Sequence, residues 1–237
     1  MKRLFYFLTT VLLLVSCGVS NKVNNTREST LSMESIKFMG VPVDGSKRKV
    51  EFALNQKGFR RDSYNDRMAG SFNGRQSYVY IHTNHQKVDR IMVLDQQPGS
   101  AIKAREYFNV LLNQLEDKVE YFKLEGDQIP SDADVEYEMT VNNKTFEASY
   151  FYAPEEYFVS TIKTVTDELF EERFNDIKEG RLSDADMETL VKERTVRRIL
   201  DNTKGQLSFC IVRLQNGKYS VAIYYDNLLN RPHGEDL

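Results

Sequence analysis

Residues 100–119, SAIKAREYFNVLLNQLEDKV, show the clearest helical pattern in the chain. Apolar side chains recur along this stretch at helical spacing: Ala104, Tyr107, Phe108, Leu111, Leu112, Leu115 and Val119. They fall on one face of a helix, and an apolar helix face has to be covered by a sheet or by another helix. The stretch therefore predicts a helix that packs against the rest of the domain.

Strand patterns flank this helix on both sides. Three strand candidates precede it, at residues 68–72, 78–83 and 88–94, and three follow it, at residues 135–140, 145–150 and 159–165. The dipeptide Asn73-Gly74 is a strong signal for a type I′ hairpin turn. A second turn at Asn142-Asn143 would set Met139 opposite Phe146, so that all apolar residues of that pair of strands share one face.

Further helices are predicted from their end signals. Ser46 is a candidate N-cap for a short helix, and Gly58 ends it in a Schellman motif with Phe59 packing on Leu54. Two late helices follow the strands. The first begins at Thr166 or Asp167 and ends at Gly180, and the second begins at a capping box formed by Ser183 and Asp186.

The chain then closes with a hairpin around Asn216-Gly217, which sets Cys210 opposite Ile223 and predicts that Cys210 is a buried, unreactive thiol. The whole order is helix, three strands, helix, three strands, two helices and a hairpin. It predicts an α+β fold with helices packed on one face of antiparallel sheet, arranged as two helix-plus-three-strand units, a late helical pair and a C-terminal hairpin. This region spans residues 35–237, and the polar connection at residues 126–134 is a candidate subdivision.

The N-terminus has the layout of a signal peptide. Lys2 and Arg3 are followed by a stretch at residues 4–15 that is apolar except for two threonines. As a helix, this stretch would span roughly 18 Å, short of the roughly 30 Å hydrocarbon core of a bilayer. We expect a signal peptide at residues 1–16 rather than a permanent transmembrane helix.

The end of this segment, Leu14-Val15-Ser16-Cys17, resembles the bacterial lipobox. The resemblance implies cleavage before Cys17, acylation of Cys17 by palmitate-like chains, and anchoring of the mature chain in a membrane. Gly18 follows the cysteine, which in lipoproteins resembles outer-membrane sorting towards the periplasm. Residues 17–34 would then be the lipidated cysteine and a polar tether. The alternative is an ordinary secretory peptide that happens to end in cysteine.

Several phrases in the first half occur together in a recognisable order. They are Phe38-Met39-Gly40-Val41-Pro42-Val43-Asp44-Gly45-Ser46, Lys57-Gly58-Phe59, Gly70-Ser71-Phe72-Asn73-Gly74 and Tyr78-Val79-Tyr80-Ile81. With the lipobox, they resemble a pattern in uncharacterised envelope lipoproteins of Bacteroidetes, over residues 36 to about 118. The order of elements is also similar to small periplasmic binding and assembly modules, such as beta-lactamase-inhibitor-like domains. These resemblances imply an envelope location and supply no catalytic residues.

Composition narrows the function further. Net charge is −3 for the whole chain and −5 once Lys2 and Arg3 are removed, so no basic excess predicts nucleic-acid binding. With Cys17 acylated, Cys210 has no disulfide partner. His82 and His85 are the close histidine pair, but no third ligand is signalled, so we expect neither a metal nor a cofactor. No motif for a catalytic nucleophile, a phosphate loop or a dinucleotide is present.

Two surfaces stand out as candidates for binding. Tyr78, Tyr80 and His82 share one face of their strand, and Arg90 and Met92 are neighbours on the next strand. Exposed aromatic faces bind peptides, glycans or proteins. The alternative is that the helix at residues 100–119 covers this face.

The second surface is a basic cluster formed by Lys192, Arg194, Arg197 and Arg198. It suits an anionic lipid or polysaccharide, although pairing with acids on its own helix explains it better.

The function most consistent with these features is a lipid-anchored, non-catalytic binding module, with an envelope protein or glycan as its partner. The alternatives are a periplasmic hydrolase acting on glycan or peptide, which requires a deep pocket, and a structural spacer.

Overall fold

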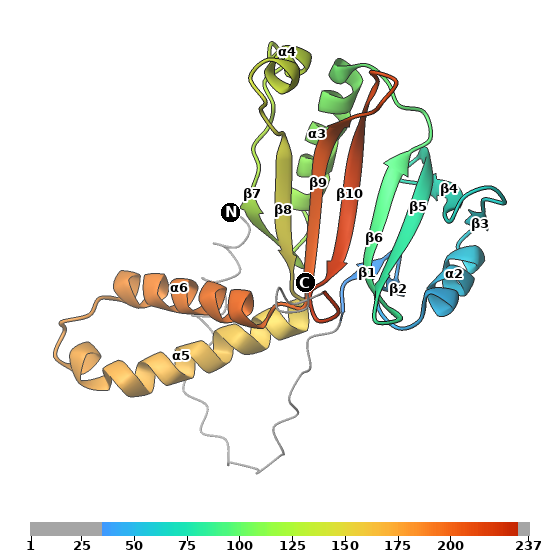
Figure 1. Ribbon diagram of the computed structural model, residues 1–237. Helices are drawn as coiled ribbons and strands as arrows, with labels where there is room; N and C mark the ends of the chain where they lie inside the picture. Colours follow the sequence, from blue (N-terminus) through green and yellow to red (C-terminus); the bar gives the residue numbers. More distant parts are fainter. Residues whose placement is uncertain (1–34, 232–237) are drawn as a thin grey trace. The chain divides into compact units, whose positions relative to one another are not determined.

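The computed structural model describes residues 35–231, in which helices and strands are assigned as follows (Figure 1). The helices are α2 (Lys47–Gln56), α3 (Ala101–Glu116), α4 (Val135–Thr140), α5 (Glu155–Lys178) and α6 (Asp184–Asn202). The strands are β1 (Lys37–Phe38), β2 (Val41–Pro42), β3 (Arg60–Arg61), β4 (Met68–Phe72), β5 (Arg75–Asn84), β6 (Lys87–Asp95), β7 (Tyr121–Glu125), β8 (Glu147–Tyr152), β9 (Gly205–Arg213) and β10 (Tyr219–Asn227).

Eight strands form one antiparallel sheet in the order β3-β4-β5-β6-β10-β9-β8-β7, and β1 pairs with β2 in a small second sheet. The predicted α+β class is therefore confirmed. Strands from both sides of residues 126–134 share the large sheet, because β7 pairs with β8 across that connection. The last strand, β10, lies between β6 and β9, near the middle of the sheet.

One face of the sheet carries the main hydrophobic core. The buried side of α3 packs on β9 and β10, and Phe108 meets Phe209 edge-on with ring centroids 5.0 Å apart. Val50 of α2, Val135 of α4 and Val79 of β5 belong to the same core. Helices α2, α3 and α4 thus share one face of the sheet. The predicted helix is confirmed, except that Val119 lies beyond its end and is exposed.

The signals at Gly58 and Asn73-Gly74 are confirmed, whereas Ser46 lies at the N-cap position without a capping bond from its side chain. Gly58, at φ +94°, donates its N–H to the carbonyl of Asn55, and Phe59 donates to Leu54, each at 3.1 Å. This is the predicted Schellman motif. Asn73 and Gly74 have φ of +50° and +75°, as a type I′ turn requires.

The strand predicted at residues 135–140 is wrong, because these residues form α4. Asp134 caps that helix by accepting a hydrogen bond from the Tyr137 N–H at 3.0 Å. The two glutamates of the first turn add favourable charge at its positive end. Capping chemistry therefore prevails over a six-residue alternation, and the turn at residues 142–143 does not join two strands. The second helix-plus-three-strand unit is wrong for the same reason, and β7 was not predicted.

The strand predicted at residues 159–165 is also wrong, because these residues belong to the long helix α5. The buried positions Phe158, Ile162, Val165 and Leu169 recur at helical spacing. The helix starts after Pro154, so the predicted start at Thr166 or Asp167 is wrong as well. Phe170 and Phe174, which were predicted to lie in the core, are exposed.

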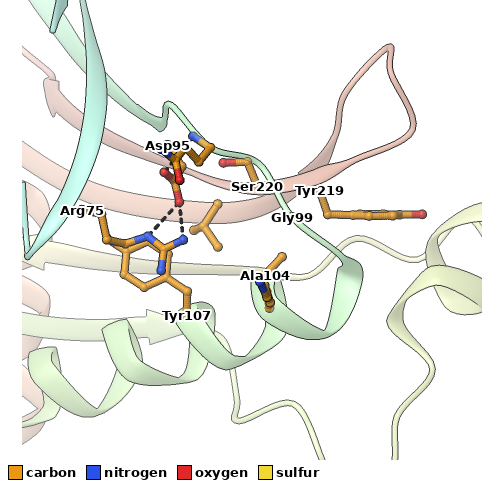
Figure 2. Close-up of a pocket in the computed structure, with 10 residues that line it drawn as sticks. Arg75, Asp95, Gly99, Ala104, Tyr107, Tyr219 and Ser220 are labelled. Atoms are coloured by element: carbon orange, nitrogen blue, oxygen red, sulfur yellow. Dashed lines mark hydrogen bonds and ion pairs between the residues drawn. The ribbon is translucent and has the colours of Figure 1, made fainter.

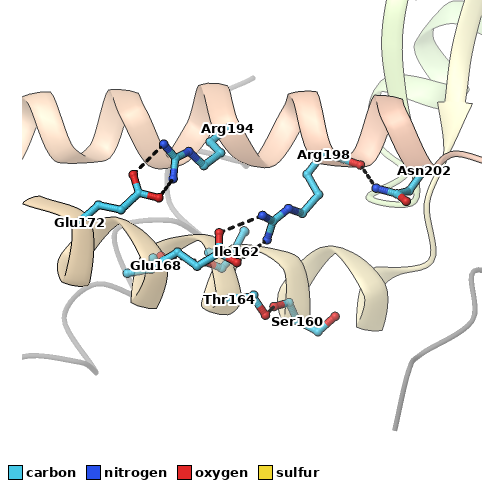
Figure 3. A network of polar contacts seen from close by, with 9 residues as sticks. Ser160, Ile162, Thr164, Glu168, Glu172, Arg194, Arg198 and Asn202 are labelled. Carbon is cyan, nitrogen blue, oxygen red and sulfur yellow. Dashed lines mark hydrogen bonds and ion pairs between the residues drawn. The ribbon is translucent and has the colours of Figure 1, made fainter. Parts of the chain in front are cut away.

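Helices α5 and α6 form a hairpin inserted between the neighbouring strands β8 and β9, beyond the ends of those strands in Figure 1. The capping box of Ser183 and Asp186 is confirmed. Figure 3 shows two bidentate ion pairs across the hairpin, Arg194 with Glu172 and Arg198 with Glu168, with hydrogen bonds of 2.8–3.0 Å. Two members of the predicted basic cluster are therefore neutralised by the adjacent helix, rather than by acids on their own helix.

The C-terminal hairpin is confirmed, but its register differs by one residue from the prediction. Its loop has three residues, because Leu214 donates its N–H to the Lys218 carbonyl at 2.8 Å. Cys210 consequently pairs with Ala222 instead of Ile223. A one-residue shift moves a side chain to the opposite face of a strand. Cys210 therefore lies on the face away from α3 and is partly exposed rather than in the core.

Candidate binding face of the sheet

The five residues predicted as a binding face lie together on one side of the sheet. Tyr80 is the cross-strand neighbour of Met92, and His82 is the neighbour of Arg90. The intervening residues Val79 and Ile81 are buried on the other side, in the core that contains α3. The alternative that α3 covers the aromatic residues is therefore wrong.

Strand pairing extends this side of the sheet across β10 and β9. Three rows of neighbours result, and we call them together the outer face. The rows are Tyr78, Leu94, Ala222 and Cys210; Tyr80, Met92, Tyr224 and Ser208; and His82, Arg90, Asp226 and Gln206. The first two rows are largely apolar or aromatic, and the third is charged and polar.

Arg67 of the segment before β4 fixes the two tyrosines of β5. Its guanidinium carbon lies 3.5 Å from the ring centroid of Tyr78 and 6.0 Å from that of Tyr80. Its Nη1 donates to the Tyr80 hydroxyl at 3.0 Å, and its Nε donates to Asp62 at 2.8 Å. The hydrogen bond to Tyr80 raises the pKa of Arg67. The rings are therefore held in place by cation–π contacts, and their orientation does not depend on a partner.

The third row is organised around Asp226, which is fully buried. Arg90 donates to its carboxylate from Nε at 2.5 Å and from Nη2 at 3.3 Å, and Arg231 Nη2 lies 2.5 Å from the same group. The bond to Asp226 raises the pKa of Arg90, whose guanidinium also lies 5.0 Å from the centroid of Tyr224. A buried carboxylate is tolerated when it is paired in this way.

His82 sits at the edge of the charged row. Its side chain is largely exposed, and Nδ1 lies 3.0 Å from Oδ1 of the buried Asp89. His85 is in the β5–β6 turn at φ +46° and is exposed. Within residues 35–231, no group of three histidine, cysteine or acidic side chains is placed to hold a metal ion.

Cys210 does not have the surroundings of a nucleophile. Burial raises the pKa of its thiol, and the charge of Glu147 adds to the effect. The thiol therefore stays protonated near neutral pH, and protonated thiols are poor nucleophiles. The predicted lack of reactivity has a physical basis, although the predicted place of Cys210 in the core was wrong.

Figure 2 shows the residues that line a small cavity between α3 and the beginning of β10. The ion pair of Arg75 with Asp95 lines it, and the Arg75 guanidinium lies 4.5 Å from the centroid of Tyr107. Its volume is about 20 Å³, which suits about one water molecule and no substrate. The Ser220 hydroxyl, which lies beside Asp95 in Figure 2, lacks a hydrogen-bond partner among the described atoms, so a water here would have a polar contact.

Sequence reasoning missed Arg67, Tyr224, Asp226 and Arg231. The sequence contains a signal for two of them, because Ala222, Tyr224 and Asp226 occupy every second position of β10 and therefore share one face of that strand. The register error at the C-terminal hairpin concealed it. Cys17, the predicted lipidation site, lies outside the described residues.

No protein family model, curated protein or solved structure matches this chain. The part of the chain that the structure describes contains no helix long and apolar enough to cross a membrane. Fold and site together define an α+β domain with helices on one face of its sheet and an aromatic, cation-lined surface on the other.

Proposed function

We propose that this chain is a lipid-anchored cell-envelope protein that binds another envelope protein through the outer face and catalyses no reaction. The lipobox-like Leu14-Val15-Ser16-Cys17 supports anchoring at Cys17. The resemblance to outer-membrane lipoproteins supports a periplasm-facing location. The anchor holds the domain at the membrane, and the outer face selects the partner.

The observation that carries this proposal is the arrangement of the first two rows. Tyr78, Tyr80, Met92, Leu94 and Tyr224 lie on adjacent strands, each is partly exposed, and the Arg67 guanidinium lies over the ring of Tyr78. Tyrosine, methionine and arginine are enriched in protein interfaces. Contiguous apolar patches on a folded domain mark interaction sites.

The cations of the outer face add specificity to this surface. Arg67 and Arg90 have their own acidic partners, so each presents a guanidinium that is already oriented. A partner that meets the tyrosines does not have to order these side chains, and the entropic cost of binding falls accordingly. The chemistry fits a partner segment with apolar side chains and acceptor groups. A glycan that stacks on the tyrosines is the alternative partner.

The cavity beside Arg75 is too small to be the active site of a hydrolase. A hydrolase acting on glycan or peptide requires a cleft that surrounds the scissile bond, and ligand pockets have volumes of roughly 300–1,000 Å³. The cavity beside Arg75 is about 20 Å³. The outer face, by contrast, offers an extended contact area without any enclosure.

The test is in-cell crosslinking followed by capture through a C-terminal tag. We expect the wild-type chain to recover one envelope protein reproducibly, and the double variant Tyr78→Ser, Tyr80→Ser to lose it. Tyr137→Ser is the matched control, because Tyr137 is an exposed tyrosine of α4 away from the outer face. Cys17→Ala should release the chain from the membrane.

Thermal unfolding of the purified variants separates binding from folding. If the double variant unfolds, the outer face belongs to the core and the site is wrong. Unchanged capture by a folded double variant would also exclude this face. Recovery of no protein by the folded, membrane-bound wild type would contradict a protein partner, and binding on a glycan array would then identify a glycan.

A further inference from the structure

The positive charge of this protein is concentrated in one segment. Residues 36–67 contain eight lysines and arginines and four acids, whereas residues 68–237 contain 20 basic and 29 acidic residues. The segment comprises β1, β2, α2, β3 and the loop that leads to β4. A net positive segment in an acidic protein creates a local potential that attracts anions.

Part of this charge is neutralised within the segment itself. Lys47 Nζ lies 2.6 Å from Asp66, and Arg67 Nε lies 2.8 Å from Asp62. Arg61 reaches Asp66 at 3.8 Å and Glu51 only at 4.0 Å. Three of the four acids thus pair with lysines and arginines of the segment, and the fourth, Asp44, accepts a hydrogen bond from Asn230.

Other cations of the segment have no acidic partner among the described residues: Arg48, Lys49, Lys57 and Arg60. Arg60 instead donates to the carbonyls of Asn55 and Phe59. Arg48 and Lys49 are exposed on α2. They line an open hollow of about 400 Å³ together with Ser46 and Phe52. We call the residues that line this hollow, Ser46, Arg48, Lys49 and Phe52, the α2 patch.

Phe52 is the apolar member of the α2 patch, and its side chain is 68% exposed. Val50 and Leu54 of the same helix are buried, so Phe52 points away from the core that they join. A second exposed aromatic residue, Tyr64, lies in the loop that Lys47 contacts through Asp66; it is 93% exposed. Basic side chains with exposed aromatic residues are the composition of membrane-interface surfaces.

The stability of α2 does not account for these residues. Its first turn carries three cations and no acid, and the Ser46 side chain makes no capping bond. Cations at a helix N-terminus oppose the helix dipole and destabilise the helix. An exposed phenylalanine likewise gains nothing from burial. The residues at the start of α2 are therefore better suited to bind an external anion than to stabilise the helix.

We infer that the α2 patch docks on an anionic phospholipid surface, with Arg48 and Lys49 contacting headgroup phosphates and Phe52 entering the interface. Charge complementarity carries this inference. The proposed anchor agrees with it, because only residues 18–34 separate Cys17 from the folded domain and so hold the domain close to the membrane. That reach is roughly 20–25 Å for a random coil. Of the arguments for this inference, only the closeness of the domain to the membrane rests on the proposed function. The outer face remains free to bind a partner.

The experiment compares two exposed phenylalanines in the full chain. Phe52→p-benzoylphenylalanine places a photocrosslinker in the patch, and Phe174→p-benzoylphenylalanine places one on α5, where Phe174 is 62% exposed. Each chain is reconstituted into phosphatidylcholine vesicles, with and without phosphatidylglycerol. Vesicle flotation reports attachment, and mass spectrometry of lipid adducts reports contact.

We expect the adduct yield at position 52 to rise at least about fivefold when phosphatidylglycerol is present, since each basic residue near an anionic surface contributes about that factor. The yield at position 174 should not change. In the charge-reversed variant Arg48→Glu, Lys49→Glu, the gain at position 52 should be lost. Acids in the first turn suit the helix dipole, so this variant should fold, which thermal unfolding checks.

Three outcomes would overturn the inference: equal yields at positions 52 and 174, equal yields in the two vesicle types, or no effect of charge reversal. Charge-dependent binding of soluble polyglutamate with no lipid adduct would assign the patch to an acidic protein segment instead. If the chain floats with the vesicles but forms no adduct at position 52, its anchor is present and the α2 patch does not contact the lipid. Failure to float would contradict the anchor separately.

Discussion

Replacing Arg90 with methionine tests the ion pairs that organise the charged row. The Asp226 side chain is 1% exposed, and Arg90 donates to it one short hydrogen bond of 2.5 Å and one long bond of 3.3 Å. Methionine keeps much of the aliphatic stem and leaves the carboxylate with Arg231 alone. A hydrogen bond to a charged group contributes about 1.5–3 kcal/mol, and breaking a buried pair costs about 3–5 kcal/mol. We therefore expect R90M to lower the free energy of unfolding by about 3 kcal/mol.

Urea unfolding measures this change, with an m-value equal to that of the wild type as the sign of two-state behaviour. Arg213→Met, at the exposed end of β9, is the control and should change stability by less than about 0.5 kcal/mol. In an Asp226→Asn background the buried charge is absent, and the two arginines are each about one-third exposed and can be hydrated. There R90M should cost only about 1 kcal/mol, which gives a coupling energy of about 2 kcal/mol. An equal cost in both backgrounds, or a cost below about 1 kcal/mol in the wild type, would refute the role of the pair.

Three further predictions concern the core, a backbone contact and the free thiol. Leu112→Ala should destabilise the protein by about 2–5 kcal/mol because this α3 side chain is fully buried, whereas Ile102→Ala on the exposed side should change little, as denaturant midpoints will show. Gly126→Ala should destabilise the protein strongly, because residue 126 has a φ of +102° and the new Cβ would lie 2.3 Å from the Cβ of Ala148. Gly180 has a φ of +69° and open space around it, so Gly180→Ala should cost only about 1–2 kcal/mol of backbone strain, again measured from denaturant midpoints. Because burial raises the pKa of Cys210, the fraction of thiolate at pH 8 should be smaller in the native protein than in the urea-unfolded protein. Maleimide labelling, followed by mass spectrometry, should therefore be slower in the native state. Equal rates would contradict the raised pKa.

Signals confined to a few residues predicted their structure correctly. The turn at Asn73-Gly74, the helix end at Gly58 and the capping box at Ser183 each depend on local hydrogen bonds and backbone angles. Such features are present in the short sequence itself, so no distant part of the chain is needed to predict them.

The errors arose where packing decided the outcome. Residues 159–165 are rich in β-branched side chains, which favour strands, yet they form part of α5, which packs against α6. Tertiary contacts override propensity in such segments. The alternation at residues 135–140 was too short to outweigh the cap at Asp134.

The candidate site was predictable only as far as neighbouring strands allowed. Alternation in β5 and a short turn to β6 placed Tyr78, Tyr80 and His82 beside Arg90 and Met92, as the structure has them. The contact of Arg90 with Asp226 joins residues 136 positions apart. It depends on β10 pairing with β6, which no local pattern indicates.

The central place of β10 sets the order in which this protein completes its fold. It is the last of the described strands to be synthesised, yet β6 and β9 both bond to it. Until residues 219–227 arrive, each of those two strands has an unpaired edge, and such edges recruit other chains. Sheet closure therefore waits until residues 219–227 have been released, and the emerging chain needs protection from aggregation until then.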